Sequence, residues 1–475
     1  MSQKTYYPTI GLEIHAELST NTKMFCKCEN NPFDATPNAH TCPVCMAHPG
    51  SLPVPNQAAI QQMIRIGSAV DGVIADFTEF DRKNYFYPDI PKGWQITQFK
   101  YPIVSGGRLA GVDITRIHLE EDTATSKHSE EGTLVDYNRA GVPLMELVTE
   151  PVLHSSEDAM NFARELQLLL RYLGASHANM EKGEMRVEVN VSVSTDQETL
   201  GTKVEVKNIA SFGMAGKAID FEINRMTDLL EAGRGDEIVQ ETRGWDDVKS
   251  QTFSQRSKEN SADYRYFPEP DIPKFHLHSL YNLDEIKATL PELPWQRRAR
   301  YSDLGLAQDA LDVLIQDQEL ATLFENTTIL FSGDTKRILL TANYIVSDLM
   351  GMIKNEKEGR LLLKKMNAET FAELMTMTDA GEINSRAAKD ILAILAKEGG
   401  DPRTIADEKD LMQQNDSEAL KGVAQSILDE NPQAVEDYKA GKETSIKFLV
   451  GQAMKATKGA ANPQMMEELF KELIN

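Results

Sequence analysis

The part of the chain before Pro291 contains several segments in which apolar and charged residues alternate. The alternation covers residues 10–15, 185–193 and 203–207. Because successive side chains of a strand point to opposite faces, each segment predicts a strand with one apolar face and one charged face. Only a short loop containing Gly201 separates the last two segments, so they are predicted to be hairpin neighbours.

A helical period occurs in the same part of the chain. Its apolar positions are Ala159, Phe162, Ala163, Leu166, Leu169, Leu170 and Leu173. Ser155 or Ser156 can cap this helix at its start, and Gly174 can end it. An antiparallel sheet with helices on its apolar face and charge on the other face is an α+β arrangement, which we expect here.

Beyond Pro291 and Pro294 the pattern becomes helical. The predicted stripes are Ile338, Ala342, Ile345, Leu349 and Met352; Ala387, Ala388, Ile391, Leu392 and Leu395; and Met465, Met466, Leu469, Phe470 and Leu473. The glycine- and proline-containing residues 399–402 interrupt the helical pattern. Asn462, followed by Pro463, predicts the start of the last helix. We therefore expect a domain over 1–292, a helical domain over 293–405 and a tail domain over 406–475.

The composition narrows the classes of protein. The chain has 475 residues, 41% apolar and 26% charged, as is ordinary for a globular protein. It contains no apolar run of ~18 residues and no visible secretory signal, so we expect no membrane segment and a cytoplasmic protein. The net charge of −23 argues against a broad positive surface for nucleic acid, but suits a chain that collects carboxylates to hold cations.

All four cysteines lie within residues 26–45, as the pairs Cys26/Cys28 and Cys42/Cys45. Two close pairs on either side of a loop are typical of a tetrahedral zinc site, in which each pair supplies two thiolates. Four cysteine ligands would close the coordination shell, so the predicted Zn²⁺ is structural. Disulfides or four free thiols are the alternatives, and a reducing compartment disfavours the disulfides.

The charged faces of the predicted strands are candidates for a metal site. Side chains two residues apart share a face of a strand, so Glu13 and His15 lie on one charged face and His118 and Glu120 on another. Glu188 belongs to a third charged face. Carboxylates and an imidazole suit Mg²⁺ or Mn²⁺, and Mg²⁺ normally arrives with nucleotide phosphates. The cations interspersed among them are Lys83, Arg186, Lys203, Lys207 and Arg265. A solvated sheet face with salt bridges explains the same parity equally well.

The chain has no Walker-type phosphate loop, so a bound nucleotide would be held by the sheet. Three further stretches, 81–89, 136–151 and 263–271, mix aromatic, charged and proline residues in a way that fits neither period. Aromatic rings beside Arg or Lys can stack on a base, or can simply anchor loops.

These stretches are similar to a known family. GLEIH (11–15), DRKNYFYPD (81–89), HLEED (118–122), the 136–151 segment, KNIASF (207–212), DYRYFPEPD (263–271) and KFLVGQAMKATKGAANPQ (447–464) occur in the order found there. The chain resembles the B subunits of the glutamine-dependent aspartyl/glutamyl-tRNA amidotransferases over essentially its whole length. The resemblance implies a cradle domain similar to the glutamine synthetase and guanido kinase catalytic fold, a helical domain and a YqeY-like α-helical tail.

The resemblance also implies a reaction. ATP phosphorylates the side-chain carboxylate of misacylated Asp-tRNA(Asn) or Glu-tRNA(Gln), and ammonia then displaces phosphate to give Asn-tRNA(Asn) or Gln-tRNA(Gln). By matching position, the Mg²⁺ ligands would be Glu13, His15, Glu120, Glu121 and Glu188. Lys83 and Arg265 would meet phosphate, together with Arg186, Lys203 and Lys207. Glu13, His15, Lys83 and Glu121 would be the catalytic residues. Consecutive strand residues point to opposite faces, so Glu120 and Glu121 can both be metal ligands only if one lies at a bulge or binds a second ion.

The implied partners follow from what the chain lacks. It contains neither an amidase signature nor a cysteine suited to a glutaminase nucleophile. The resemblance therefore implies that ammonia comes from the amidase partner, the A subunit, with a small C subunit completing a heterotrimer. The tail carries five lysines between 439 and 458 against one acid, a local charge of +4, and is the expected tRNA contact.

Two other functions fit parts of the pattern. The first is a glutamine synthetase-like ligase that acts on a free amino acid and needs no RNA. The second is a noncatalytic zinc-bearing RNA-binding or assembly protein, which would leave the carboxylate faces without a chemical role.

Overall fold

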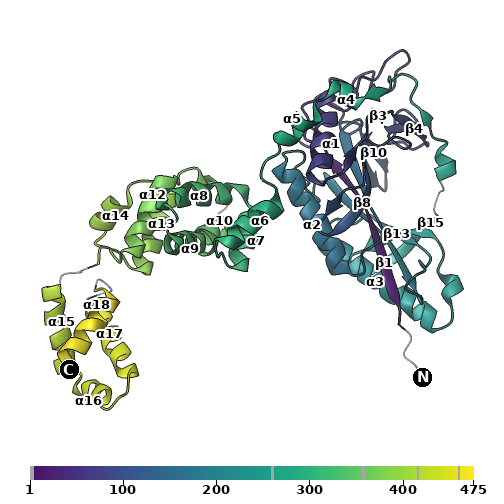
Figure 1. Ribbon diagram of the computed structural model, residues 1–475. Coiled ribbons are helices and arrows are strands. Elements are labelled where there is room, and N and C mark those ends of the chain that lie inside the picture. The colour runs from purple at the N-terminus through teal and green to yellow at the C-terminus, as the bar shows by residue number, and fades with distance from the viewer. Residues whose placement is uncertain (1–4, 258–260, 356–358, 414–416, 458–460, 475) are drawn as a thin grey trace. The chain divides into compact units, whose positions relative to one another are not determined.

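The structure is a computed structural model that describes residues 5–257, 261–355, 359–413, 417–457 and 461–474. The chain divides into two compact units, Met1–Pro294 and Trp295–Asn475 (Figure 1). Among the described residues, no helix is both long and apolar enough to cross a membrane.

A ten-stranded sheet is the centre of the first unit in the described part of the chain. Its order is β15-β14-β13-β12-β1-β11-β8-β6-β2, and β7 pairs with β8. The strands are β1 Tyr7–Glu17, β2 Val73–Ile74, β6 Val104–Ser105, β7 Arg108–Leu109, β8 Val112–Glu121, β11 Pro143–Thr149, β12 Met185–Ser194, β13 Val204–Lys207, β14 Glu241–Asp246 and β15 Gln251–Ser257. All neighbours are antiparallel except β13 and β14.

The predicted alternation in β1 is confirmed, because Ile10, Leu12 and Ile14 are buried. Helices α1 Gln57–Ala69, α2 Ser156–Tyr172 and α3 Phe212–Glu231 pack against this sheet (Figure 1). Ser155 is the cap of α2, since its Oγ accepts a hydrogen bond from the backbone N–H of Asp158. The α+β class predicted from the sequence is confirmed, whereas the likeness to the glutamine synthetase and guanido kinase fold stays a prediction.

The predicted hairpin of β12 and β13 is also confirmed. The two strands pair antiparallel, with Val191 opposite Val204. The connecting loop passes so close to β12 that a Cβ on Gly201 would lie 2.1 Å from the carbonyl oxygen of Val193. Only glycine permits that approach of two backbones.

Smaller sheets flank the main one. β4 Asp81–Asn84 pairs with β5 Trp94–Thr97 and with β16 Phe267–Pro268. The remaining strands are β3 Phe77–Thr78, β17 Phe275–His276, β9 Thr125–Ser129 and β10 Gly132–Asp136. The pairing of β4 with β16 joins two of the unusual stretches, 81–89 and 263–271. Arg82 fixes this junction through an ion pair with Glu269 at 2.7 Å and contact with the ring of Trp94 at 4.0 Å.

The second unit is helical, as predicted. Its main helices are α6 Pro294–Asp303, α7 Gln308–Gln316, α8 Gln318–Thr328, α9 Thr335–Asn343, α10 Met350–Asn355, α11 Arg360–Leu363, α12 Ala368–Asp379, α13 Ser385–Glu398, α14 Pro402–Glu408, α15 Ser417–Glu430, α16 Pro432–Lys439, α17 Thr444–Ala456 and α18 Pro463–Ile474. A π-helical segment, Tyr344–Leu349, joins α9 to α10. Helices α4 Leu277–Leu280 and α5 Leu283–Ala288 belong to the first unit.

The predicted apolar stripes of the helices in the second unit face its core, and one residue assigned to them is corrected. The 387–395 stripe is buried throughout, and Met466, Leu469 and Phe470 are buried in α18. Leu473 is wrongly placed in the α18 stripe, because its side chain is 37% exposed and Ile474 is buried instead. The buried row advances by four residues from Met466 through Phe470 to Ile474, which turns Leu473 outward. Buried apolar residues of α15, α17 and α18 share one cluster, and the domain boundary at 405 stays a prediction.

Candidate active site

The charged face of the main sheet gathers residues from five adjacent strands, β13, β12, β1, β11 and β8. GLEIH lies in β1, HLEED lies in β8 except for its last residue Asp122, and β11 runs between the two strands. Antiparallel pairing places Glu146 of β11 opposite His15 on one side and opposite His118 on the other. Because opposed residues share a face, the three side chains form one row across the sheet.

Glu146 lies at the centre of this row. Its Oε2 is 3.4 Å from Nε2 of His15 and 3.4 Å from Nε2 of His118. Glu120 joins the row, since its Oε1 lies 3.7 Å from Nε2 of His15. Glu13 lies at the edge, with its Oε1 4.0 Å from the same nitrogen. The sequence-predicted residues Glu13, His15 and Glu120 are therefore brought together around a carboxylate that had not been predicted.

The ligand atoms fall into three overlapping groups. They are Glu13, His15 and Glu146; His118, Glu120 and Glu146; and Glu13, Glu188 and Glu205. Within each group the atoms lie within 4.8 Å of one another. Ligand atoms around one Mg²⁺ lie up to about 4.2 Å apart, because each bond is 2.0–2.1 Å long. The donor chemistry and the spacing therefore fit divalent cations after small side-chain movements.

Glu188 belongs to the third group but also has a cation beside it. The Nζ of Lys207 lies 2.6 Å from Oε2 of Glu188 and 3.8 Å from Oε1 of Glu205. Glu205 also accepts a hydrogen bond of 2.7 Å from the hydroxyl of Thr242. The carboxylate of Glu188 thus lies beside both a possible ion position and the ammonium of Lys207.

A cavity of about 370 Å³ opens over this face. It is lined by Glu13, Lys83, Thr97, Gln98, Phe99, Arg116, His118, Glu120, Glu146, Lys203, Glu205, Lys207, Thr242, Tyr264 and Tyr266. Five residues predicted as metal or phosphate contacts, Glu13, Lys83, Glu120, Lys203 and Lys207, are in this lining. The cavity combines acidic groups and lysines, which suit a magnesium-bound nucleotide, with aromatic rings.

The ionisable side chains of this face shift one another's pKa values. Burial disfavours the imidazolium forms, yet the carboxylate of Glu146 raises the pKa of both His15 and His118 to about 9. The two imidazoles in turn hold the pKa of Glu146 well below its usual range, against the effect of burial. Burial and the neighbouring charge of Glu146 raise the pKa of Glu13. Protons on the two histidines therefore balance part of the negative charge when no metal is bound.

Lys83 supplies a permanent positive charge at this cavity. Burial opposes that charge, but Glu120 and Glu146 raise the pKa of Lys83 above its usual range. Its Nζ also lies 5.2 Å from the ring centroid of Tyr264, within cation–π distance. Lys83 is held there by β4, whose residues pair with β5 and β16.

Five of the predicted Mg²⁺ and phosphate residues are not part of this lining. His15 and Glu188 still belong to the groups of possible ligands, whereas Glu121, Arg186 and Arg265 do not. Glu121 contacts Lys92, with 2.6 Å between Oε2 and Nζ, and lines a second cavity beside the cysteines. Arg186 donates to Asp122 of the HLEED stretch and lies opposite His15 in β12. Arg265 is exposed, and its backbone carbonyl accepts a 2.8 Å hydrogen bond from Asn84. This placement gives no support to a metal role for Glu121 or to a phosphate role for Arg265.

Sequence reasoning missed Glu146 and Glu205 as site residues, and it placed His118 on a candidate metal face without assigning it as a ligand. A signal for Glu146 was present, since Met145 and Leu147 flank it in an apolar alternation typical of a strand. Glu205 lay between Lys203 and Lys207 on a charged face that had been identified. No local pattern indicates that β11 separates β1 from β8, and that order decides which carboxylate lies in the middle.

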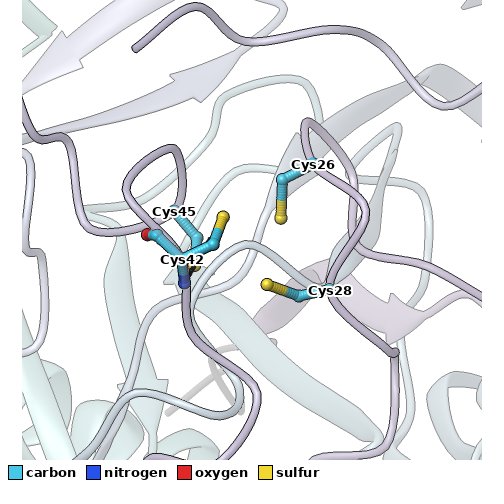
Figure 2. Close-up of side chains that lie close together, drawn as sticks. All are labelled: Cys26, Cys28, Cys42 and Cys45. Atoms are coloured by element: carbon cyan, nitrogen blue, oxygen red, sulfur yellow. Dashed lines mark hydrogen bonds between the residues drawn. The ribbon is translucent and has the colours of Figure 1, made fainter.

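The four cysteines form a second candidate metal centre. Figure 2 shows the sulfur atoms of Cys26, Cys28, Cys42 and Cys45 pointing toward one another. All four sulfurs lie within 4.8 Å of one another, the Cys42–Cys45 pair is 3.8 Å apart, and none forms a disulfide. Four thiolates around Zn²⁺ at ~2.3 Å are about 3.8 Å apart, so the arrangement fits the predicted zinc.

A buried lysine supports the cysteine cluster. Lys23 is fully buried, and its Nζ donates to the carbonyls of His40 at 2.7 Å and Tyr137 at 3.1 Å. The same Nζ lies 4.0 Å from Sγ of Cys45. A hydrogen bond from the Cys26 thiol and the charge of Lys23 together lower the pKa of Cys45 to about 5. The cluster is thus prepared to hold at least one thiolate.

Comparison with known proteins agrees with this architecture. Residues 8–282 match the model described as the GatB/GatE catalytic domain, and residues 323–474 match that of the GatB domain. The chain is 41% identical to the B subunit of the aspartyl/glutamyl-tRNA(Asn/Gln) amidotransferase of Persephonella marina and 41% identical to that of Thermus thermophilus, in each case over 99% of both chains. It is 42% identical to the B subunit of the chloroplastic/mitochondrial glutamyl-tRNA(Gln) amidotransferase of Oryza sativa subsp. japonica, over 98% of this chain and 87% of the relative. On these matches the chain belongs to the GatB/GatE family of amidotransferase B subunits.

Proposed function

We propose that this chain activates the side-chain carboxylate of a misacylated tRNA with ATP, so that ammonia converts Asp-tRNA(Asn) or Glu-tRNA(Gln) to the amidated form. The similar proteins are named as amidotransferases that act on these tRNAs. The observation that carries the proposal is the joining of three cation-binding groups, through Glu13 and Glu146, beside a cavity that also contains Lys83 and Lys207.

The reaction consists of two displacements, the first at phosphorus and the second at the acyl carbon. A carboxylate oxygen of the aminoacyl side chain forms a bond to the γ-phosphorus of ATP, the bond to the β-phosphate oxygen breaks, and ADP leaves. The nitrogen of ammonia then bonds to the acyl carbon, phosphate leaves with the electron pair, and a proton is released. A carboxylate alone is a poor electrophile, so the acyl phosphate provides the leaving group.

The residues of the cavity suit this chemistry. Mg²⁺ ions, each held by one of the three ligand groups formed by Glu13, His15, Glu146, His118, Glu120, Glu188 and Glu205, would offset the charge of the phosphates. Lys83 keeps its proton in the buried cavity and can contact a phosphoryl oxygen at the point where charge develops. Lys207 is positioned by Glu188 to do the same on the other side. Arg186, paired with Asp122, would support the row from β12 rather than contact phosphate.

Partners supply what this chain lacks. We propose that ammonia comes from an amidase, the A subunit of the enzyme, and that a small C subunit completes the heterotrimer. The structural Zn²⁺ would hold the 26–45 insertion and take no part in the reaction. Both cavities are in the first unit, so the whole activation step is assigned to the proposed catalytic domain, 1–292.

We assign tRNA contact to the tail, 406–475. Lys439, Lys442, Lys447 and Lys455 are located in the described part of the tail, and Lys458 lies outside the described residues. Lys442 forms a 3.0 Å ion pair with Asp437, which lowers the charge that it can offer to a phosphate backbone. Contact by the tail would therefore rest on the other three lysines of the described set and on the shape of the RNA.

The test supplies the full heterotrimer with ammonium chloride, ATP, Mg²⁺ and misacylated Asp-tRNA or Glu-tRNA, and measures amidated aminoacyl-tRNA. Product and equimolar ADP are expected. Absence of product with correctly misacylated tRNA would refute the proposal. The same reaction with free aspartate or glutamate, and with ribonuclease added to the tRNA reaction, separates this function from a ligase for free amino acids.

Matched variants identify the site in the same assay. Glu13→Gln and His15→Ala should abolish amidation while leaving glutamine hydrolysis by the amidase partner unchanged. Glu150→Gln is the control, because Glu150 lies just beyond β11 and accepts a hydrogen bond from Thr115 outside the cavity lining. Full amidation by the Glu13 and His15 variants would show that this sheet face is merely a solvated one.

A further inference from the structure

Two aromatic rings at the edge of the active-site cavity stack on each other. The centroids of Phe99 and Tyr266 are 4.0 Å apart and their planes differ by 6°. Both residues line the cavity, together with Tyr264. Tyr264 meets Tyr266 edge-on at 5.9 Å and lies beside the ammonium of Lys83. The stacked pair is therefore continuous with the charged part of the site.

Phe99 is held rigidly and yet remains exposed. Its backbone N–H donates to Oδ2 of the buried Asp81 at 2.9 Å, and the N–H of Lys100 donates to the same oxygen at 3.2 Å. Although Tyr266 covers one face of the ring, the side chain of Phe99 is 51% exposed. A preorganised aromatic ring exposed beside a cavity rich in charge favours a planar, uncharged ligand group that is joined to an anionic one.

We propose that Phe99 is the stacking platform for an adenine ring, a role that rests on the function proposed above. Two substrates of that reaction contain this ring: ATP, and the 3′-terminal adenosine that carries the amino acid on the tRNA. In either case the ring would stack on the exposed side of Phe99, while Tyr266 supports the opposite side. The phosphates, or the side-chain carboxylate of the esterified amino acid, would then extend toward Lys83 and the row of carboxylates.

The first experiment measures the binding of Mg-ADP and of magnesium pyrophosphate to the heterotrimer by calorimetry, for the wild type, Phe99→Ala and Phe99→Trp. If the adenine of ATP stacks on Phe99, Phe99→Ala should bind ADP roughly 5- to 150-fold more weakly, as one lost stacking contact predicts. Pyrophosphate affinity should not change, because pyrophosphate has no ring. Phe99→Trp should bind ADP as tightly as the wild type.

The second experiment measures the KM for misacylated tRNA at saturating ATP in the same variants. If the terminal adenosine stacks on Phe99, the KM for tRNA should rise by the same factor in Phe99→Ala, recover in Phe99→Trp, and leave ADP binding unchanged. Phe253→Ala is the control, since Phe253 is an exposed phenylalanine of β15 outside the cavity lining. Equal melting temperatures would exclude misfolding as the cause.

The outcomes separate the two proposals. If the wild type amidates tRNA but Phe99→Ala changes neither ADP affinity nor the KM for tRNA, the platform is refuted and the proposed function stands. If Phe99→Trp is as impaired as Phe99→Ala, stacking is refuted. If the wild type neither binds Mg-ADP nor forms amidated tRNA, the proposed function is refuted, and the platform with it.

Discussion

Glu120 and Glu121 are consecutive residues of β8, and their carboxylates serve two different cavities. Glu120 places its Oε1 3.7 Å from His15 and accepts a 3.0 Å hydrogen bond from Thr97. Glu121 accepts from the backbone N–H of Ile96 at 2.9 Å and pairs with Lys92 at 2.6 Å. Strand parity, which sends successive side chains to opposite faces, accounts for this division without a bulge.

This division predicts opposite phenotypes for the two glutamates. Glu120→Gln should weaken binding of Mn²⁺, used as a probe for Mg²⁺, at least 10-fold, because it removes a charged ligand from the His118–Glu146 group. Glu121→Ala should leave Mn²⁺ affinity unchanged but lower the free energy of unfolding by ~3 kcal/mol, since it leaves Lys92 buried without its partner. Calorimetry and urea unfolding measure the two effects. If Glu121→Ala weakened Mn²⁺ binding and Glu120→Gln did not, the metal would lie on the face of β8 opposite to the one proposed.

Glu146 should be the most sensitive carboxylate of the site, because it belongs to two of the three groups that could hold a cation. Glu146→Gln keeps the shape of the side chain but removes the charge shared by His15 and His118. We expect a loss of Mn²⁺ affinity larger than that of Glu188→Gln, and no detectable amidation. Glu150→Gln, from the same segment, should bind Mn²⁺ as the wild type does. Equal effects at Glu146 and Glu188 would argue against a shared central ligand.

Stability should depend on pH through the two histidines. Their pKa of about 9 in the folded chain exceeds the ordinary value of ~6.5, so the folded state binds these protons more tightly than the unfolded state. Their contribution to stability is therefore complete below pH ~6.5 and is lost as the pH rises through 9. Urea unfolding at pH 6.5, 8 and 9.5, without Mg²⁺ or Mn²⁺, should show this decline, and Glu146→Gln should reduce it.

Metal binding should show the opposite trend with pH. Since a ligating imidazole must lose its proton, Mn²⁺ and protons compete for His15 and His118. The affinity for Mn²⁺ should increase between pH 6.5 and 9 and then level off. Calorimetry at pH 8 in two buffers of different ionisation enthalpy should detect proton release. Binding that releases no proton would show that neither imidazole is a ligand.

The sequence was sufficient for the parts of the fold that depend on local period. The strands containing Ile10 and Val191, and the helix capped near Ser155, follow from alternation, helical spacing and capping residues. The cluster at 26–45 follows from cysteine spacing alone. These features need no knowledge of which strand lies beside which, and for that reason they were predictable.

The remainder of the site depends on long-range pairing. Glu146 becomes central only because β11 lies between β1 and β8. Likewise, β4 pairs with β16 although Arg82 and the Glu269 that it contacts are 187 residues apart in the sequence. Similarly, the exposure of Arg265 and the pairing of Lys92 with Glu121 arise from contacts distant in sequence. Charge alternation could identify a candidate face, but the order of the strands decides which charges meet.

The start of α2 offers a test with a neighbouring control. Ser155 accepts a hydrogen bond of 3.1 Å from the N–H of Asp158, and so satisfies one of the free donors of the first turn. Ser155→Ala should lower the free energy of unfolding by about 1 kcal/mol. Ser156→Ala, within the helix, should have a smaller effect. Urea unfolding of both variants measures the difference, and equal losses would show that capping does not depend on Ser155.

The cysteine cluster should lose stability when its metal is removed, and Lys23 should control how tightly the metal is held. Four thiolates around Zn²⁺ leave a net charge of −2, and the fully buried ammonium of Lys23 lies 4.0 Å from one of the sulfurs. Lys23→Met removes this charge and leaves the carbonyls of His40 and Tyr137 without their donor. We expect zinc affinity to fall roughly 10- to 100-fold, as for other groups that support metal ligands.

Competition with a chromophoric chelator measures the zinc affinity, and thermal unfolding before and after chelation measures its contribution to stability. Lys27→Met is a matched control, because Lys27 lies between Cys26 and Cys28 but its side chain is exposed. Water screens an exposed charge, so this variant should retain zinc nearly as well as the wild type. If both lysine variants lost zinc equally, overall charge near the loop, rather than the buried contact of Lys23, would determine the affinity.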